Sequence, residues 1–442
     1  MKASTLFSVT LFSWAAVAFP ANLLNNLPAD LSDEGLAEIT ELAAKITRAV
    51  EEMPANLAKR QLGASILPPG FDAEAQRIST TGEHRYIAPG KDDLRGPCPG
   101  LNVMANHGYL PRNGIASVTQ LTTASNEVFG MGLELSAFLS VLATVMGGDI
   151  VSSSIGGPPS GGLLGGLTTG LGLVGKPQGM SGTHNRFEAD CSPTREDLYK
   201  NGNPVSLNLP QFEELMAMPI GPNGYDLTVM HPFRGSRYNN SVATNGHYWA
   251  GPLTHYAINT ATYLFTYHFF ANHSAEYPEG YLDGETLKSF EGVTGEKGSF
   301  KWARGQEKIP ENWYRRAIGD DYGIAAFTLD AVGALQALPY MAVLGGNTGE
   351  PNTFTGVNIA DLTGGVFNAE TLLEDNNLMC FAFQAVNSAS PDILKGLLGN
   401  VLLAVQKLTD ALNPILAKLG CPDLAKYDKS LLAKFPGAGA GL

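Results

Sequence analysis

The chain has 442 residues, of which 42 are acidic and 29 are basic, so its formal net charge at pH 7 is −13. Such an acidic chain lacks the basic surface that nucleic acids and anionic membranes require, and we expect neither as a partner. The length allows two or three domains or one large helical domain. A charged fraction of only 16%, with 51 glycines and 27 prolines, favours a secreted globular enzyme with long ordered loops.

The first 18 residues have the pattern of a secretory signal peptide. Lys2 precedes an apolar run that starts at Leu6 and ends in Ala16-Val17-Ala18, too short for a membrane anchor. We therefore expect a secreted, extracellular protein. Residues 19–60 are expected to form a propeptide or an amino-terminal arm with an amphipathic helix. This segment ends in Lys59-Arg60, which is either a dibasic processing site or an ordinary surface pair.

A polar, extended segment over residues 61–93 leads into Gly96-Pro97-Cys98-Pro99-Gly100-Leu101-Asn102. Pro99 has the fixed φ of a first helical turn and no N–H to satisfy, so a helix is predicted to begin directly after Cys98. The N–H groups of Gly100 and Leu101 would then point at the sulfur and stabilise a thiolate. Such a thiolate can bind haem iron. The alternatives for Cys98 are a half-cystine and a buried free thiol.

Together with Ala105-Asn106-His107-Gly108-Tyr109-Leu110-Pro111-Arg112, this motif strongly resembles the fungal haem-thiolate peroxidases, the chloroperoxidases and the long unspecific peroxygenases. The resemblance implies a mainly α fold, a single large helical haem domain of the chloroperoxidase-like type with long loops. We expect that domain to span residues 61–430, before a flexible tail at 431–442, and the resemblance itself covers roughly residues 95–421. It also implies haem b as cofactor, Cys98 as the axial iron ligand and H₂O₂ as the oxidant.

The next predicted element is a largely buried helix over residues 118–146, which Ser117 can cap. Residues 147–182 are rich in Gly, Ser and Pro and are expected to form a long loop. No Lys-Ser or Lys-Thr follows the paired glycines, and no strand precedes them, so this loop is not a phosphate-binding motif.

A second motif runs from His184 to Arg195 and contains Glu188-Ala189-Asp190. Its spacing alone favours a capped helix start with solvated acids. The motif resembles the Glu-Gly-Asp metal site of the long peroxygenases, which implies Mg²⁺ bound by Glu188, the carbonyl of Ala189 and the hydroxyl of Ser192. Because Ala replaces Gly here, the carbonyl can serve only if residue 189 needs no positive φ.

A helix around residues 211–218 is followed by an irregular loop to residue 251, in which Asn239 begins a glycosylation sequon. A further helix over residues 255–270 leads into the third motif, which contains His268, His273 and Glu276. The resemblance implies Glu276 as the distal acid–base that moves the peroxide protons. His273 or His268 would assist it, since the Arg of the long peroxygenases is missing. Asn272 also begins a sequon, which we expect to be unoccupied because a glycan would block the pocket.

The carboxy-terminal part is predicted to contain a short helix at 285–290, an apolar segment at 324–344 and a helix at 391–418 that breaks near Pro414. The four cysteines are Cys98, Cys191, Cys380 and Cys421, and three pairings are open if all are bridged. The resemblance favours a Cys380–Cys421 disulfide and leaves Cys191 as a free thiol, buried or slow to react.

We therefore expect a haem-thiolate enzyme that uses H₂O₂ to oxygenate or oxidise small apolar or aromatic molecules, in a pocket lined by the aromatic residues of 265–270. Two alternatives stay open. A cysteine hydrolase would pair Cys98 with His107 or His184. A non-catalytic haem-binding protein would keep Cys98 but lack a working distal site.

Overall fold

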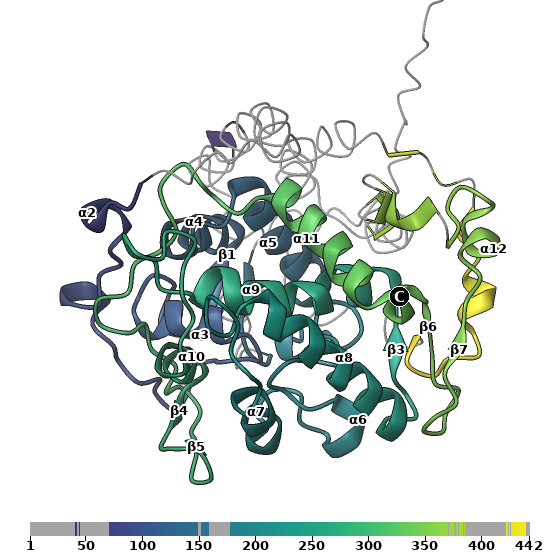
Figure 1. Ribbon diagram of the computed structural model, residues 1–442, viewed down its shortest axis with the longest axis horizontal. Helices are drawn as coiled ribbons and strands as arrows, with labels where there is room; N and C mark the ends of the chain where they lie inside the picture. Colours follow the sequence, from purple (N-terminus) through teal and green to yellow (C-terminus); the bar gives the residue numbers. More distant parts are fainter. Residues whose placement is uncertain are drawn as a thin grey trace, which may run out of the picture.

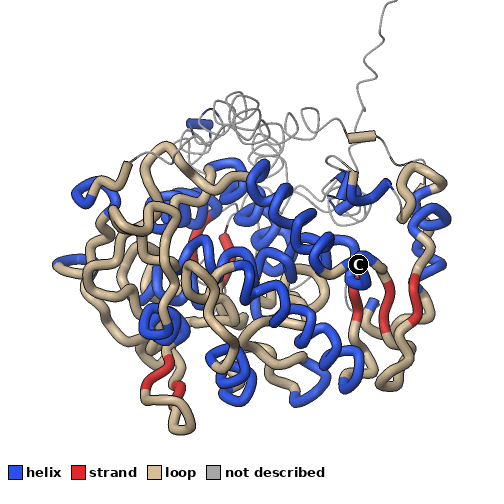
Figure 2. Tube along the Cα trace, in the orientation of Figure 1, coloured by secondary structure: helices blue, strands red, loops and turns tan. Residues whose placement is uncertain are grey.

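Helices dominate the part of the chain that the computed structural model describes, which confirms the mainly α prediction (Figures 1 and 2). The described residues are 40, 41, 44, 70–148, 152–158, 177–369, 371–374, 377–378, 380–382, 384, 421–422, 424 and 426–438. The predicted signal peptide, Lys59-Arg60 and the predicted helix at 391–418 lie outside them. Among the described helices, none is long and apolar enough to cross a bilayer.

The α-helices in chain order are α2 (Ala73–Gln76), α3 (Pro99–Asn106), α4 (Val118–Phe129), α5 (Leu133–Gly147), α6 (Leu198–Asn201), α7 (Leu209–Met216), α8 (Leu227–Thr244), α9 (Thr260–Phe270), α10 (Gly284–Glu291), α11 (Ile324–Ala337) and α12 (Ile359–Thr363). A π-helical turn, Thr254–Asn259, leads directly into α9. Short 3-10 turns lie at Gly82–His84, Met180–Gly182, Pro339–Ala342, Thr371–Leu373 and Lys429–Leu432.

The described strands are short and antiparallel. β1 (Ile115–Ser117) pairs with β2 (Ser152–Ser154), and β4 (Val293–Thr294) pairs with β5 (Lys301–Trp302). β2 is buried beside α5. β6 (Gly345–Gly346) lies between β3 (Trp249–Ala250) and β7 (Thr355–Gly356).

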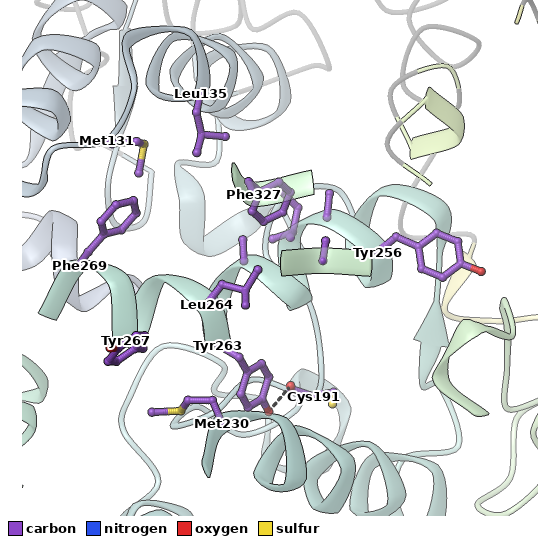
Figure 3. Packing of buried hydrophobic residues seen from close by; sticks show 14 of the residues in the cluster. Met131, Leu135, Cys191, Met230, Tyr256, Tyr263, Leu264, Tyr267, Phe269 and Phe327 are labelled. Carbon is purple, nitrogen blue, oxygen red and sulfur yellow. Dashed lines mark hydrogen bonds between the residues drawn. The ribbon is translucent and has the colours of Figure 1, made fainter. Parts of the chain in front are cut away.

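The core is organised around α9, which lies between other helices and has most of its residues buried, many of them aromatic. α9 contacts α8 on one side and α11 on another. Figure 3 shows Tyr263 directed toward Cys191 and α8, whereas Phe269 points toward Met131 on the opposite side. The Tyr263 hydroxyl donates to the Cys191 carbonyl at 2.9 Å.

The helix predicted over residues 118–146 is two helices with a sharp corner between them. Ser117 caps the start of α4 as predicted, and Gln120 completes a capping box with it. Gly130 adopts the left-handed conformation (φ 64°) and ends the helix. The side chain of Asn126 donates to the Met131 carbonyl at 2.8 Å and holds the corner. The apolar pattern continues across the break because both helices face one core.

Helix α8 replaces much of the irregular loop expected before residue 251. Its mean hydropathy is low and it contains Pro232, so its residue pattern does not indicate a helix. The Asp226 carboxylate caps it by accepting from the Thr228 N–H at 2.9 Å. Arg234 and Arg237 lie on its buried face and interrupt the apolar periodicity.

The carboxy-terminal prediction is confirmed in one part and differs in another. Cys380 and Cys421 form a disulfide, and Cys191 is a buried free thiol. The described part of the predicted flexible tail instead packs on the domain: the Phe435 ring lies 4.9 Å from that of Trp249. Asn185 also donates to the carbonyl of Gly437 at 3.0 Å. Buried apolar and polar contacts therefore hold the tail in place.

Candidate active site

Cys98 occupies the N-cap position of α3, with Pro99 in the first turn. The backbone N–H groups of Leu101 and Gly100 act to lower the pKa of the thiol, although the Cys98 side chain makes no capping hydrogen bond at this helix start. Burial raises the pKa of the Cys98 thiol, while those N–H groups and the positive charge of Arg195 oppose that rise. The sulfur thus has several groups around it that favour the thiolate or its ligation to a cation.

A buried asparagine fixes the loop that carries Cys98. The Oδ1 of Asn102 accepts from the Gly96 N–H at 3.0 Å, and its Nδ2 donates to the Gly96 carbonyl at 3.0 Å and to Glu307 Oε1 at 2.9 Å. Burial raises the pKa of Glu307, and the Asn102 hydrogen bond acts against that rise. Gly96 itself has no room for a side chain, since a Cβ would lie 1.8 Å from the Ile155 carbonyl oxygen.

A buried ion pair lies near the thiol. Arg195 Nη1 is 2.5 Å from Glu291 Oε2, and both side chains are at most 2% exposed. Glu291 is the last residue of α10 and lines the same cavity as Cys98. The ion pair therefore brings the end of the second motif, at Arg195, close to the cysteine loop.

Cys98 opens onto a largely apolar cavity of about 220 Å³. Its walls come from the cysteine loop, α4, α5, the second motif and α9. Rings dominate the apolar lining: Phe129, Phe187, Phe265, Phe269 and Phe270. Hydroxyl groups also line it: Ser125, Ser136, Ser140, Ser153, Ser154, Ser192, Thr194, Thr262 and Thr266. Such a cavity, apolar with a few polar groups, is typical of a site for a planar cofactor and a small organic molecule.

The structure does not bring Glu276 into this cavity. Glu276 is exposed, in the turns that follow α9, and it is not among the lining residues. The predicted distal acid–base role therefore disagrees with its position, because a general base must be within hydrogen-bond reach of the proton it moves. The aromatic residues of α9 do line the cavity as predicted, but the chain turns outward before residue 276.

The two candidate assistant histidines also lie elsewhere. His273 is buried, its Nδ1 is 2.8 Å from the Pro278 carbonyl, and burial lowers its pKa to about 4. His268 is on α9 but on a different face from the cavity, and its Nε2 is 2.9 Å from Asp330 Oδ2. Neither histidine lines the cavity.

The second motif does reach the cavity, through Glu188, Ala189 and Ser192. Ala189 has no positive φ; Asn185 and Cys191 take the left-handed conformation instead. Glu188 Oε2 already contacts His184 Nδ1 at 2.7 Å, and among the described residues no group of three His, Cys, Asp or Glu is arranged for a metal ion. These side chains thus give no support to a Mg²⁺ site at the second motif.

His184 links Glu188 to a buried acidic cluster. Its Nε2 lies 3.7 Å from Asp190 Oδ1. Burial lowers the pKa of His184, but the hydrogen bond to Glu188 and the charge of Asp190 outweigh it, so that the pKa is raised. Burial and the neighbouring Asp197 raise the pKa of Asp190. The raised pKa values of His184 and Asp190 favour their protonated forms beside Glu188, which lines the cavity.

The hydrogen bonds of His107 do not suit a cysteine hydrolase. Its Nδ1 lies 2.7 Å from the His84 carbonyl, and its Nε2 accepts from the Ile309 N–H at 3.1 Å. Both ring nitrogens are therefore engaged with the backbone, and burial lowers the pKa of the ring. His184 is likewise bonded to Glu188.

The predicted sequons lie at different degrees of exposure. Asn239 is exposed on α8. Asn272 is half-buried, and its Oδ1 accepts from the Tyr314 N–H at 2.8 Å. The side chain of Asn272 thus has a structural role beside the end of α9.

Sequence reasoning missed Asn102, Arg195 and Glu291 as parts of the site. Asn102 stands inside the cysteine motif four residues after Cys98, so a helical turn already placed it beside that loop. Arg195 was the last residue of the second motif. Glu291 carried no signal, because its place depends on how α10 packs.

Comparison with known proteins gives one family and several relatives. Residues 84–318 match the family described as peroxidase, family 2. The chain is 47% identical over 370 residues to the dothistromin biosynthesis peroxidase dotB of Dothistroma septosporum, which covers 83% of this chain and 88% of that protein. It is 39% identical over 383 residues to the aromatic peroxidase fscJ of Fusarium equiseti, with 83% and 86% covered. An aromatic peroxygenase of Coprinellus radians is 31% identical over 259 residues, with 58% and 91% covered.

Proposed function

This chain belongs to the family-2, chloroperoxidase-like peroxidases and is thus a haem-dependent oxidoreductase, and we propose that it uses H₂O₂ to oxidise or oxygenate small aromatic molecules. The Cys98 thiolate would hold the haem iron. The observation that carries the proposal is the position of Cys98: a thiol at a helix N-terminus, facing an apolar cavity. These residues suit haem b, which supplies the peroxide-dependent redox chemistry when bound.

The protein's own contribution begins with the thiolate. The N–H groups of Gly100 and Leu101 would hold its charge, and Asn102 would keep the loop in position. These N–H groups would stabilise the negative charge on the sulfur and would thereby tune how strongly the thiolate donates to a bound iron. The surrounding phenyl rings exclude water from the reacting atoms.

For the proton transfers of peroxide cleavage, we assign Glu188 in place of Glu276. Of the described residues that line the cavity, Glu188 and Glu291 carry carboxylates, and Glu291 is neutralised by Arg195. Glu188 shares a hydrogen bond with His184, so one proton can pass between Glu188 Oε2 and His184 Nδ1.

The cavity lining favours aromatic substrates that carry hydroxyl groups. Phenyl walls accommodate flat rings. The hydroxyls of Thr262, Thr266 and Ser140 each donate to a backbone carbonyl, which leaves their oxygens as acceptors. Such acceptors would receive a phenolic O–H. The names of the relatives, an aromatic peroxidase and an aromatic peroxygenase, agree with this class of substrate. We also propose that the protein is secreted, from the signal-like pattern of its first 18 residues.

The test is Cys98→Ser in the secreted, haem-loaded protein, with Cys191→Ser as the matched control. The wild type and the control should show the strongly red-shifted Soret band of a thiolate ligand when reduced under carbon monoxide, and should oxidise a phenol with H₂O₂. Cys98→Ser should lose both. If Cys98→Ser keeps the red-shifted band, another residue is the ligand and the assignment is wrong.

A further inference from the structure

Tyr322 is a buried tyrosine that packs directly behind the cavity wall. It is 1% exposed, and its ring lies edge-on to Phe269 and Phe265 at centroid distances of 5.6 and 6.3 Å. Both phenylalanines line the cavity. The backbone of Tyr322 is bonded to the corner between α4 and α5, with its N–H donating to the Gly130 carbonyl at 2.8 Å and its carbonyl accepting from Gly132 at 2.9 Å. The ring is thus held at a fixed distance from the cavity.

The hydroxyl of Tyr322 has an acidic partner toward the surface. It donates to Asp330 Oδ2 at 2.8 Å, and the same oxygen is 2.9 Å from His268 Nε2. The His268 ring also stacks on the Tyr322 ring at 4.3 Å. The side chains of His268 and Asp330 are 18% and 31% exposed. One end of this group therefore faces the cavity wall and the other faces solvent.

The surroundings of the ring decide which oxidised form it could take. The Arg316 guanidinium lies over the Tyr322 ring, 5.4 Å from its centroid. A cation at this position disfavours a positively charged ring. Loss of an electron from Tyr322 must therefore be accompanied by loss of the hydroxyl proton, and Asp330 Oδ2 is placed to accept it.

We propose that Tyr322 is a redox-active residue that carries oxidising equivalents from the haem cavity to the His268–Asp330 surface, where aromatic donors too large for the cavity are oxidised. This inference rests on the proposed function, because H₂O₂ acting at the haem supplies the oxidant. One electron passes from Tyr322 to the oxidised haem, the phenolic O–H bond breaks, and its proton bonds to the Asp330 carboxylate. A neutral tyrosyl radical remains. A donor phenol at the surface then gives one electron to the radical and releases its own proton to solvent. The proton held by Asp330 returns to the Tyr322 oxygen, which restores both residues and leaves a phenoxyl radical.

Other buried tyrosines lack this arrangement. The hydroxyl of Tyr256 donates to the Ala342 carbonyl at 2.6 Å, and that of Tyr263 donates to the Cys191 carbonyl. A backbone carbonyl accepts a hydrogen bond but does not take the proton, since it is far less basic than a carboxylate. Tyr256, which is fully buried, is therefore a matched control.

The experiment is electron paramagnetic resonance of the haem-loaded protein, frozen shortly after H₂O₂ is added. The wild type should give a tyrosyl signal that narrows when the protein is made with ring-deuterated tyrosine. Tyr322→Phe should lose that signal and the oxidation of a bulky phenolic dye, while it keeps the oxidation of a small phenol. Tyr256→Phe should match the wild type. Asp330→Asn keeps Tyr322 and a hydrogen-bond acceptor but removes the base, so its signal should also fall.

The outcomes separate this inference from the proposed function. A tyrosyl signal that is unchanged in Tyr322→Phe, or absent from a wild type whose Soret band responds to H₂O₂, overturns the role of Tyr322 and leaves the proposed function intact. If the wild-type Soret band does not respond to H₂O₂, the proposed function fails, and this inference fails with it.

Discussion

Replacing Asn102 with Ala should destabilise the protein strongly, because its side chain satisfies three buried groups at once. The change leaves the N–H and carbonyl of Gly96 and one oxygen of Glu307 without their partner. Each such loss costs about 1 to 3 kcal/mol, and more for a charged acceptor, so we expect the free energy of unfolding to fall by about 3 to 5 kcal/mol.

The loss should also depend on pH. The pKa of Glu307 is raised in the folded state, so its charged form opposes folding, and stability falls as pH rises from the ordinary carboxyl range through the folded pKa. Removing the Asn102 donor raises that pKa further. The destabilisation by Asn102→Ala should therefore be larger at neutral pH than near pH 4.

The assay is urea unfolding of the haem-loaded protein, followed by circular dichroism, with Asn203→Ala as the control. Asn203 also makes three hydrogen bonds, with Val205 and Ser206, but it is exposed, so water replaces them. Asn203→Ala should cost less than about 1 kcal/mol. Equal effects of the two changes would refute the argument that burial of the Asn102 network controls the stability of the cysteine loop.

Two further changes test the site and the disulfide. Glu188→Gln should slow the reaction of the haem with H₂O₂ by about 100-fold or more, whereas Glu276→Gln should leave its rate unchanged. Stopped-flow absorbance measures both rates. A slow Glu276→Gln variant and an unchanged Glu188→Gln variant would restore Glu276 to the distal role. Replacing both Cys380 and Cys421 with Ala removes a crosslink between residues 41 positions apart and should lower the free energy of unfolding by about 4 kcal/mol. Urea unfolding measures this difference. A value under about 1 kcal/mol would show that the disulfide does not restrain the unfolded chain.

The position of Cys98 in front of a helix could be predicted from the sequence because it depends only on the residues at that helix start. Pro99 starts α3 directly after Cys98, so the N–H groups of Gly100 and Leu101 act on the thiol from the first turn whatever the rest of the chain does. The same holds for the capping box at Ser117, which needs only Gln120 three residues later. A motif whose residues lie within a few positions of one another adopts the same local geometry in any fold that contains it.

The non-local parts could not be read in this way. Glu276 lies six residues beyond the end of α9, and the turns after Phe270 direct the chain out of the cavity, which no residue pattern indicates. Helix α8 was missed because Arg234 and Arg237 occupy its buried face. Burial of charge depends on partners far away in sequence, and a single chain's periodicity does not report them.

The network around Asn102 also has a consequence for synthesis of the chain. Its partner Glu307 is 205 residues further along. At roughly 5 to 20 residues per second, the ribosome needs about 10 to 40 s to supply that residue after Asn102 has been made. Through that interval the Cys98 thiol is without the segment that encloses its loop, and Cys191 is made before the interval ends. If the chain is secreted as we propose, the two thiols can pair wrongly in the oxidising compartment, and correct folding would then require isomerases or early capture of Cys98 by haem.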